Sequence, residues 1–500
     1  MKMLIDGELT DAYDGRTIEV KNPVTNEVVD TIPQASKQDV DRALAASKRG
    51  LAKWSRVPLK DKEKIYEVFF ELMNEHKRDI LGTLMKESGC SMRNALFQWQ
   101  GIPGLFRGYL ETAKRYDGSL LVPGTEPGHD GKTEHDLQMV VYEPVGTVLA
   151  IVPFNAPLML FGYKVAPALA AGNAVIVKPP TSNPLALMKL IHLFWEAGVP
   201  KDALQVVTGS GAQMGDWMVE DPRIDAVTLT GSTDVGLHIA EILAKRLAPC
   251  ALELGGNDPF IVLEDADVEA AGIEAASWRM NSAGQVCIAP KRFLVQNSVK
   301  EKFTEAALRV VQKIEMGFDM DIEQELDIYA DKEFTDLKPG KMLMNSLISE
   351  SAARTVEEQI QHTLAQGARV LHGGKRHGSF IEPTVLTDVT KDMDVAKDME
   401  IFGPVLPIIG FDTPEEAIEI ANSSQFGLSG CVMTRDWKKG MYFARKIESG
   451  GVVVNGTGTY RNMMQPFGGY KLSGQGKEGF ATLGEMVREK VIVLKGFLSE

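Results

Sequence analysis

The feature that most constrains the fold is a regular alternation between short apolar runs and helical patterns, which begins at Thr147. Expected strands and expected helices follow one another at 147–152, 158–171, 174–178, 184–197, 204–208, 212–219, 226–229 and 235–245. A parallel sheet covered by helices on both faces requires this order, because its strands are buried on both sides. The sequence therefore predicts an α/β fold. A helical bundle with apolar loops is the alternative interpretation.

A second series of apolar runs predicts another α/β domain of similar size. Its expected strands lie at 260–263, 293–296, 405–411, 428–434 and 452–455. Two or three domains are expected in any case, because 500 residues exceed what one core usually holds. A further apolar run at 491–495 has no helix after it, and a terminal strand of this kind often joins the sheet of a neighbouring chain.

The segments around these two series are less regular. Ser36 and Asp39 form a capping-box pattern that opens a helix through about Ser47. Further helices are expected at 59–87 and 105–116, and the Gly- and Pro-rich, then polar, residues 117–139 suit an excursion from the main body. The acidic, Met-rich segment 317–347 is interpreted as a solvated surface insertion.

Composition excludes several classes of protein. A formal net charge of −14 disfavours a nucleic-acid partner, which needs clustered cations. The longest apolar runs are too short to cross a membrane, and the N-terminus lacks an export signal, so a cytoplasmic protein is expected. No His/Cys/Asp cluster has ligand spacing, so no metal is expected. The cysteines lie far apart without a CxxC pair, which argues against disulfides and zinc: Cys90, Cys250, Cys287 and Cys431.

Three short stretches contain residues suited to covalent chemistry on a carbonyl group. Cys287, in GQVCIAPKR, could attack an aldehyde as a thiolate. Glu253, in LELGGNDP, could activate the water that hydrolyses a thioester, and Asn155, in PFNAP after an expected strand, could donate to an oxyanion. Taken alone, each has an ordinary explanation: a buried small hydrophobe, a surface charge and a turn residue.

Together with KPPT, TGSTDVG, EIFGPV and PFGGYKLSG, these stretches occur in an order and at a spacing that resemble the aldehyde dehydrogenase superfamily, over about residues 1 to 498. The resemblance implies an α/β fold with a Rossmann-type dinucleotide-binding domain (1–116 and 140–252) and an α/β catalytic domain (253–455). It also implies a small oligomerisation β-flap (117–139 and 479–500). A homodimer or homotetramer is implied as well, in which 491–495 extends a neighbour's sheet.

The resemblance also assigns catalytic roles. Cys287 becomes the nucleophile and Glu253 the general base, while Asn155 and the Cys287 backbone N–H form the oxyanion hole. Lys164 and Glu478 match positions linked to proton relay. The implied reaction oxidises an aldehyde to a carboxylic acid through a thiohemiacetal and a thioester, with transfer of a hydride to a nicotinamide dinucleotide and hydrolysis by Glu253-activated water.

The cofactor site lacks GxGxxG, and the family's TGSTxxG pattern stands in its place at the start of a helix. Its residues are expected at the pyrophosphate, Lys178 at the adenosine ribose, Glu400 at the nicotinamide ribose and Phe402 beside it. The full set of expected cofactor contacts is Val152, Pro153, Phe154, Lys178, Thr181, Gly211, Gly215, Thr230, Gly231, Ser232, Val235, Leu254, Glu400 and Phe402.

Thr181 indicates which dinucleotide is used. NAD-preferring relatives usually carry a glutamate at this position, three residues after the lysine of KPPT, which binds the ribose 2′-hydroxyl. A carboxylate would repel a 2′-phosphate, whereas a threonine can donate a hydrogen bond to it. The sequence therefore favours NADP. Use of both NADP and NAD is the alternative.

The substrate is expected to be a small anionic aldehyde bearing a carboxylate, phosphate or sulfonate. Arg107, on an expected helix, and Arg461, before PFGGYK, match segments that line the substrate tunnel in relatives, and two arginines there would suit an anion. The chain resembles succinate-semialdehyde and non-phosphorylating glyceraldehyde-3-phosphate dehydrogenases. It departs from the former at Tyr163, where an arginine is expected, and from the latter at Val286, which also replaces an arginine. Ala289 excludes the redox-switch disulfide of some relatives.

Two other functions remain as alternatives. A CoA-acylating enzyme would release the acyl group to CoA, but such relatives commonly lack the glutamate of LELGG, so Glu253 favours hydrolysis. A catalytically inactive member of the fold usually loses the nucleophile or the base. Cys287, Glu253 and Asn155 are all present.

Overall fold

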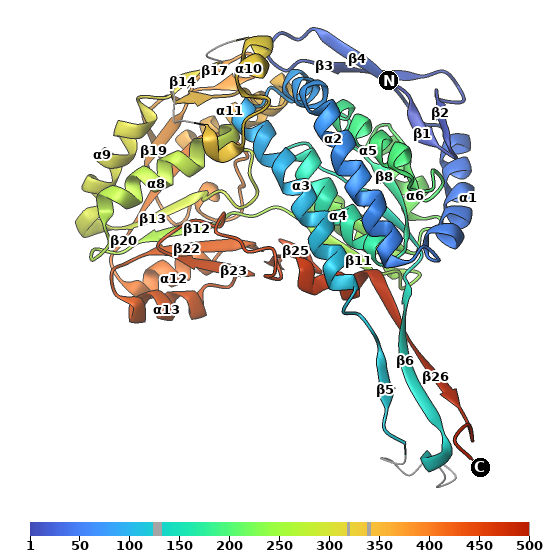
Figure 1. Ribbon diagram of the computed structural model, residues 1–500. Coiled ribbons are helices and arrows are strands. Elements are labelled where there is room, and N and C mark those ends of the chain that lie inside the picture. The colour runs from blue at the N-terminus through green and yellow to red at the C-terminus, as the bar shows by residue number, and fades with distance from the viewer. Residues whose placement is uncertain (124–132, 318–320, 338–341, 500) are drawn as a thin grey trace.

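The computed structural model describes residues 1–123, 133–317, 321–337 and 342–499. Two sheets form two lobes, and a narrow third sheet projects from them (Figure 1). Parts of the expected flap and of the acidic insertion lie outside the described residues, as does Glu500.

The first sheet has eight strands, and its five central strands are parallel. Their order is β2 (Glu8–Thr10), β1 (Met3–Ile5), β9 (Leu204–Val206), β8 (Ala174–Lys178), β7 (Thr147–Ile151), β10 (Ala226–Thr230), β11 (Cys250–Glu253) and β25 (Gly474–Gln475). The expected α/β fold is confirmed here, because uninterrupted apolar runs such as β8 are buried along their whole length. The alternation predicted β7, β8, β9 and β10 with errors of a residue or two, but it did not include β11.

Two hydrophobic clusters cover the two faces of this sheet. The cluster on one face contains α2 (Leu59–Ser88), α3 (Met92–Ala113), α4 (Pro157–Ala170) and α5 (Leu185–Ala197). The cluster on the other face contains α1 (Lys37–Trp54), α6 (Gly211–Val219) and α7 (Thr233–Ala244). Alternate residues of each strand enter opposite clusters, which is why the strands read as continuous apolar runs.

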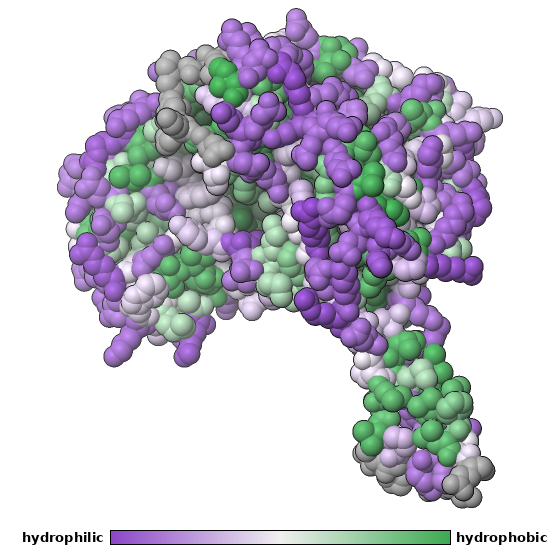
Figure 2. All heavy atoms as spheres, viewed as in Figure 1, coloured by the Kyte–Doolittle hydropathy of each residue, from purple (hydrophilic) through white to green (hydrophobic). Residues whose placement is uncertain are grey.

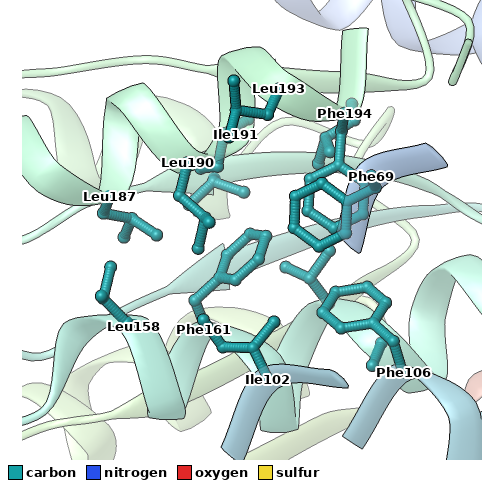
Figure 3. Packing of buried hydrophobic residues seen from close by; sticks show 14 of the residues in the cluster. Phe69, Ile102, Phe106, Leu158, Phe161, Leu187, Leu190, Ile191, Leu193 and Phe194 are labelled. Carbon is teal, nitrogen blue, oxygen red and sulfur yellow. The ribbon is translucent and has the colours of Figure 1, made fainter. Parts of the chain in front are cut away.

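An aromatic group holds α2, α3, α4 and α5 together on the first face (Figure 3). Phe69 stacks on Phe194 with ring centroids 3.6 Å apart, and Phe106 lies 5.0 Å from Phe194 and 6.1 Å from Phe161. Aromatic pairs at these separations add to the free energy gained from burial. The position of α4 is therefore firmly set, and α4 carries two residues of the candidate site.

The second sheet has seven strands, all parallel except β16. Their order is β16 (Arg369–His372), β19 (Thr384–Val389), β20 (Val405–Phe411), β13 (Arg292–Gln296), β12 (Pro259–Val262), β22 (Ser429–Met433) and β23 (Gly451–Val454). One hydrophobic cluster packs α8 (Val268–Met280) and α9 (Lys300–Val311) on one face. The other contains α11 (Glu350–Ala365), α12 (Pro414–Asn422) and α13 (Trp437–Lys446).

The third sheet consists of β5 (Ser119–Leu121), β6 (Leu137–Pro144) and β26 (Val487–Leu494), with β6 in the centre. The strand expected at 491–495 begins four residues earlier than expected and pairs with β6 of its own chain over its full length. The edge of β26 that faces away from β6 has no strand beside it in the described chain. Large apolar side chains on this projecting sheet are exposed (Figure 2), including Leu120, Val122, Val491, Val493 and Phe497.

The first helices differ from the expectation at their ends. The capping box of Ser36 and Asp39 is present, but α1 continues to Trp54, whose indole is buried and donates to the Leu169 carbonyl. The helix expected at 105–116 begins at Met92, because Ser91 caps it and Pro103 is tolerated inside it. Gly101, Pro103 and Gly104 interrupt the helical pattern, so the sequence predicted only the second half of α3.

The remaining elements are short. Strands β3 (Thr17–Lys21) and β4 (Val28–Pro33) form a hairpin, and paired two-residue strands are β14 (Glu315–Met316) with β15 (Leu343–Met344), β17 (Arg376–His377) with β18 (Phe380–Ile381), and β21 (Phe426–Gly427) with β24 (Tyr470–Lys471). The described acidic segment forms α10 (Ile322–Tyr329), which docks on α2 through buried Leu326 and the pairs of Arg78 with Glu323 and Asp327. It is therefore not merely a solvated insertion. No helix in the described ranges is both long and apolar enough to cross a bilayer.

Candidate active site

The expected nucleophile follows an unusual turn at the end of α8. Ser282, Ala283 and Gly284 all have positive φ angles, of 51°, 52° and 75°. A Cβ atom at Gly284 would lie 2.2 Å from the Gly403 carbonyl oxygen, so only glycine fits this close approach. Asn94 Nδ2 of α3 donates to Ser282 Oγ at 2.6 Å. This contact fixes the turn that leads to Cys287, which is partly exposed.

Asn155 lies in the loop between β7 and α4, next to the nucleophile loop. Its Nδ2 donates to the Gln285 carbonyl oxygen at 3.2 Å. The loop follows the carboxyl end of a central parallel strand, where open α/β sheets bind ligands. An amide here can turn from the Gln285 carbonyl to an oxyanion formed beside Cys287.

Glu253 ends β11 and is buried, and neither of its oxygens has a hydrogen-bond partner in the described chain. A Cβ atom at Gly468 would lie 2.6 Å from Glu253 Oε1, so the PFGGYK segment covers the carboxylate closely. Burial and then the Glu478 charge raise the pKa of Glu253 well above its ordinary value. A carboxyl group with a raised pKa is a stronger base, which suits proton abstraction from water.

A buried charge group adjoins Glu253. Lys164 Nζ of α4 lies 3.2 Å from Glu478 Oε1, and Arg461 Nη2 lies 3.6 Å from Glu478 Oε2. Lys164 and Arg461 both counteract the rise in the pKa of Glu253. The structure therefore brings the two expected proton-relay residues into contact with each other and into the electrostatic reach of the expected base.

Arg461 is held between two aromatic rings. Its Cζ atom lies 4.4 Å from the Tyr163 ring centroid and 3.8 Å from that of Phe467. The side chain is 16% exposed, and its Nε and Nη2 have no hydrogen-bond partner among the described residues. A buried guanidinium with free donors is suited to an anionic ligand.

Arg107 does not join this group. It lies on α3, is 55% exposed and makes two hydrogen bonds to Glu67 of α2, of 3.0 and 2.7 Å. Its guanidinium also lies over the Phe70 ring. The contacts of Arg107 and Arg461 share no residue, so the expected convergence of two arginines is wrong. The sequence indicated a helix but not which neighbouring helix the side chain would face.

The expected adenosine end of the cofactor site lies beside β8. Lys178 Nζ donates to Thr181 Oγ1 at 3.1 Å, and Thr181 Oγ1 donates to the Gly209 carbonyl at 3.0 Å. Burial lowers the pKa of Lys178 to about 8. The lysine therefore faces the threonine on which the NADP expectation depends.

The start of α7 fits an anionic group. Ser232 occupies the N-cap position without a side-chain capping bond, and Thr230 Oγ1 is buried without a partner in the described chain. First-turn N–H groups at such a helix end are unsatisfied and attract phosphate. Gly231 lies between Thr230 and Ser232 in the chain. At Gly211 and Gly215, by contrast, an added Cβ atom would have no other atom within 4 Å. Val235 is exposed and Leu254 packs against Gly236, beside this helix end.

The expected nicotinamide end joins the two lobes. Glu400 Oε1 accepts a hydrogen bond from the Gly256 N–H at 3.2 Å. The Phe402 ring lies edge-on to Phe154 with centroids 6.0 Å apart. The loop with Phe154 begins at Val152, whose N–H donates to the Lys178 carbonyl, and continues through Pro153. Glu400 and Phe402 thus contact Gly256 and Phe154, which lie far from them in the sequence.

Sequence reasoning missed two residues of the site. Phe467 of PFGGYK forms one wall around Arg461. Lys291 Nζ donates to the Cys287 carbonyl oxygen at 2.5 Å and lies 3.3 Å from Glu400 Oε1. The run PKR after the nucleophile was the available signal for Lys291, but a lysine after a proline normally indicates an exposed loop. No group of metal-ligating side chains is present in the described ranges.

The comparison with known proteins identifies the family. The model of the aldehyde dehydrogenase family matches residues 10–492. The chain belongs to the aldehyde dehydrogenase family. The sequence-based resemblance is thereby confirmed.

Two relatives of this aldehyde dehydrogenase have names that specify a charged aldehyde. It is 34% identical to 3-sulfolactaldehyde dehydrogenase of Pseudomonas putida, over 95% of this chain and 93% of the relative. It is also 34% identical to the NADP(+) succinate-semialdehyde dehydrogenase GabD of Escherichia coli, over 95% of this chain and 94% of GabD. The structure of betaine aldehyde dehydrogenase from Staphylococcus aureus in complex with NAD+ has a TM-score of 0.89 and 32% identity, and covers 99% of this chain and 95% of that one. The expected fold and the oxidoreductase class are confirmed.

Proposed function

We propose that this aldehyde dehydrogenase oxidises a small anionic aldehyde to its carboxylic acid through a thioester on Cys287, with NADP as the favoured acceptor. One observation carries the proposal: Cys287, Asn155 and Glu253 come from three distant segments that are linked by a hydrogen bond and by charge. Asn155 bonds the loop of Cys287, and the Glu253 charge acts on the Cys287 thiol.

The proposed reaction uses these side chains in sequence. The Cys287 thiolate attacks the aldehyde carbon, while Asn155 Nδ2 and the Cys287 N–H donate to the oxyanion. A bound nicotinamide dinucleotide supplies the hydride acceptor. Glu253 then removes a proton from the water that attacks the thioester carbonyl, which releases the acid and the thiol. Lys164 and Glu478 lead that proton away.

Thr181 supports the preference for NADP. Its hydroxyl and the Lys178 ammonium face each other where a 2′-phosphate would bind, with no carboxylate in the KPPT stretch. The remaining expected contacts would hold the pyrophosphate at α7 and the nicotinamide ribose at Glu400. NAD remains the alternative acceptor, because loss of a glutamate admits NADP without excluding NAD.

Arg461 supports an anionic substrate. Its free, buried donors lie beside the charge group of Lys164 and Glu478, between Tyr163 and Phe467. Succinate semialdehyde and sulfolactaldehyde, named for two relatives, bear a carboxylate and a sulfonate. A single arginine replaces the pair that the sequence led us to expect.

Hydrolysis rather than transfer to CoA is proposed for the second half-reaction. The carboxylate of Glu253 is buried, unpartnered and held against the glycines of PFGGYK, as a base that acts on one water requires. An acyl-CoA product on addition of CoA to the assay would contradict this half of the proposal.

We also propose the division into a dinucleotide domain (1–116 and 140–252), a catalytic domain (253–455) and a flap (117–139 and 479–500). The three sheets support it. The exposed apolar side chains of the flap and the open edge of β26 support a homo-oligomer, a dimer or tetramer, in which β26 extends a neighbour's sheet. A cytoplasmic location is proposed from the sequence alone.

The test is a panel of anionic and neutral aldehydes, each assayed with NADP and with NAD. We expect Cys287→Ala to abolish oxidation while dinucleotide binding is retained. Cys250→Ala is the matched control, because Cys250 is also partly exposed but begins β11. Turnover by Cys287→Ala close to that of the unaltered protein would refute the proposal.

A further inference from the structure

Lys291 lies directly beside the nucleophile Cys287. Lys291 is 1% exposed, and its ammonium has two strong partners: the carbonyl oxygen of Cys287, at 2.5 Å, and Glu400 Oε1, at 3.3 Å. A weaker contact of 3.4 Å joins it to the Ala289 carbonyl. A buried ammonium costs free energy unless its protons are bonded, and these contacts supply the bonds that offset the burial of Lys291.

The charges around Cys287 are otherwise negative. Burial, and after it the carboxylates of Asp258, Glu253 and Glu400, raise the pKa of the thiol to about 12. Asp258 lies just before β12, Glu253 ends β11, and Glu400 lies in the loop before β20. Among the groups that act most strongly on the thiol in the described chain, Lys291 alone lowers its pKa. A thiolate is needed for attack on a carbonyl. Lys291 is therefore the cation that offsets burial and the neighbouring carboxyl groups, although burial also raises the pKa of Asp258 and of Glu253.

The backbone around Lys291 is also fixed. The N–H groups of Lys291 and Arg292 both donate to the Asp258 carbonyl oxygen. Arg292 is buried and donates to the carbonyls of Asn257, Ala396, Ile420 and Ala421. The ammonium of Lys291 therefore reaches back to the Cys287 peptide from a rigid base.

We propose that Lys291 is a positioning residue for the nucleophile: it fixes the Cys287 peptide, supplies the positive charge that favours the thiolate, and is balanced by Glu400. The inference rests on the proposed function only for its importance to catalysis. Because Glu400 is the carboxylate expected at the nicotinamide ribose, the same lysine links a residue of the expected cofactor site to the backbone of the nucleophile.

The experiment measures the rate constant for alkylation of Cys287 by iodoacetamide, without any dinucleotide, across the neutral and alkaline pH range. Mass spectrometry of the peptide that contains Cys287 separates it from the other cysteines. Lys291→Met keeps the length of the side chain and removes its charge. Its alkylation rate at fixed pH should fall about 10- to 1000-fold, since an opposite charge at this range shifts a pKa by about 1–3 units.

The second variant should act in the opposite direction. Glu400→Gln keeps an oxygen that can accept from the Gly256 N–H, and it removes the charge that balances Lys291. Alkylation of Cys287 should therefore become faster at every pH below the thiol pKa. This variant also keeps the proposal testable if Lys291→Met fails to fold, because Glu400 is 20% exposed.

Lys62→Met is the matched control. Lys62 is equally buried and also donates to backbone carbonyls, those of Leu169 and Ala170, but it lies on α2. It should lower the Tm as Lys291→Met does and leave alkylation of Cys287 unchanged. Equal effects of both lysine variants, or a Glu400→Gln rate that is unchanged or slower, would overturn the inference.

These outcomes differ from a failure of the proposed function. If Cys287→Ala still oxidised aldehydes, the catalytic assignment would be lost, whereas the alkylation rates would still report on Lys291. If Cys287→Ala were inactive and the Lys291 and Glu400 variants left alkylation unchanged, only the role of Lys291 would be lost.

Discussion

Replacement of Arg461 by methionine should convert a preference for anionic aldehydes into indifference to charge. The guanidinium is held by stacking on Phe467 and Tyr163 and pairs with Glu478 through Nη2 at 3.6 Å, while its Nε and Nη2 make no hydrogen bond within the described chain and can bond a substrate. Methionine keeps apolar contact with both rings and removes the charge and the donors. Because the change also removes a cation beside Glu253 and Glu478, the comparison of a charged with a neutral aldehyde isolates the contribution of the substrate charge.

The magnitude follows from the kind of bond lost. A hydrogen bond to a charged group contributes about 1.5–3 kcal/mol. At about 1.36 kcal/mol per factor of ten, kcat/KM for an anionic aldehyde should fall about 10- to 150-fold. Ordinary surface ion pairs are worth about 0–1 kcal/mol, but Arg461 is 16% exposed and its partners are screened less by water.

The assay compares succinate semialdehyde with butanal, which has the same carbon chain without the carboxylate. We expect the kcat/KM for butanal to change only a few-fold, because Tyr163 and Phe467 remain. Arg107→Met is the matched control, since Arg107 also lies over a phenylalanine ring and pairs with a glutamate, but on α2 and α3. An unchanged ratio of the two aldehydes in Arg461→Met, or an equal change in Arg107→Met, would refute the reasoning.

Three further outcomes follow from the site. Glu253→Gln should give a stoichiometric burst of reduced dinucleotide and then a much slower steady rate in stopped-flow absorbance, and an unaltered steady rate would remove this base from the mechanism. Thr181→Glu should weaken NADP binding by at least about fivefold relative to NAD in calorimetric titrations, because like charges near 4 Å repel by about 1–4 kcal/mol; equal effects on both dinucleotides would contradict the assignment. Burial lowers the pKa of Lys178 to about 8, so the ammonium is charged below that pH and loses its charge above it. NADP affinity should therefore decline as the pH rises through and beyond 8, while NAD affinity stays level, and parallel profiles would exclude contact with the 2′-phosphate.

The central strands were predictable because burial on both faces leaves a signal in the sequence. The central parallel strands of the two large sheets read as largely apolar runs, as at β8 and β12. The start of α3 was not predictable in the same way. Gly101, Pro103 and Gly104 interrupt its pattern, and only packing on α4 and on the nucleophile turn accounts for the helix there.

The residues of the site also differ in how far the sequence predicts their roles. Cys287, Glu253 and Asn155 follow recognisable motifs, so their chemistry was accessible from the sequence. Whether an arginine faces the site depends on the orientation of a whole helix or loop, and for this reason Arg461 and Arg107 could not be told apart. Lys291 was overlooked because nothing local shows that a lysine after a proline turns inward to a backbone carbonyl.

The turn of Ser282, Ala283 and Gly284 has a consequence for how the nucleophile loop is assembled. Residues other than glycine adopt left-handed backbone angles at a cost of about 1–2 kcal/mol each, so this stretch does not favour its own native shape. The bond from Asn94 to Ser282 comes from a helix nearly two hundred positions earlier. A chain in which that helix has not yet docked has no local reason to form the turn, and the sulfur reaches its final place only after the two lobes have come together.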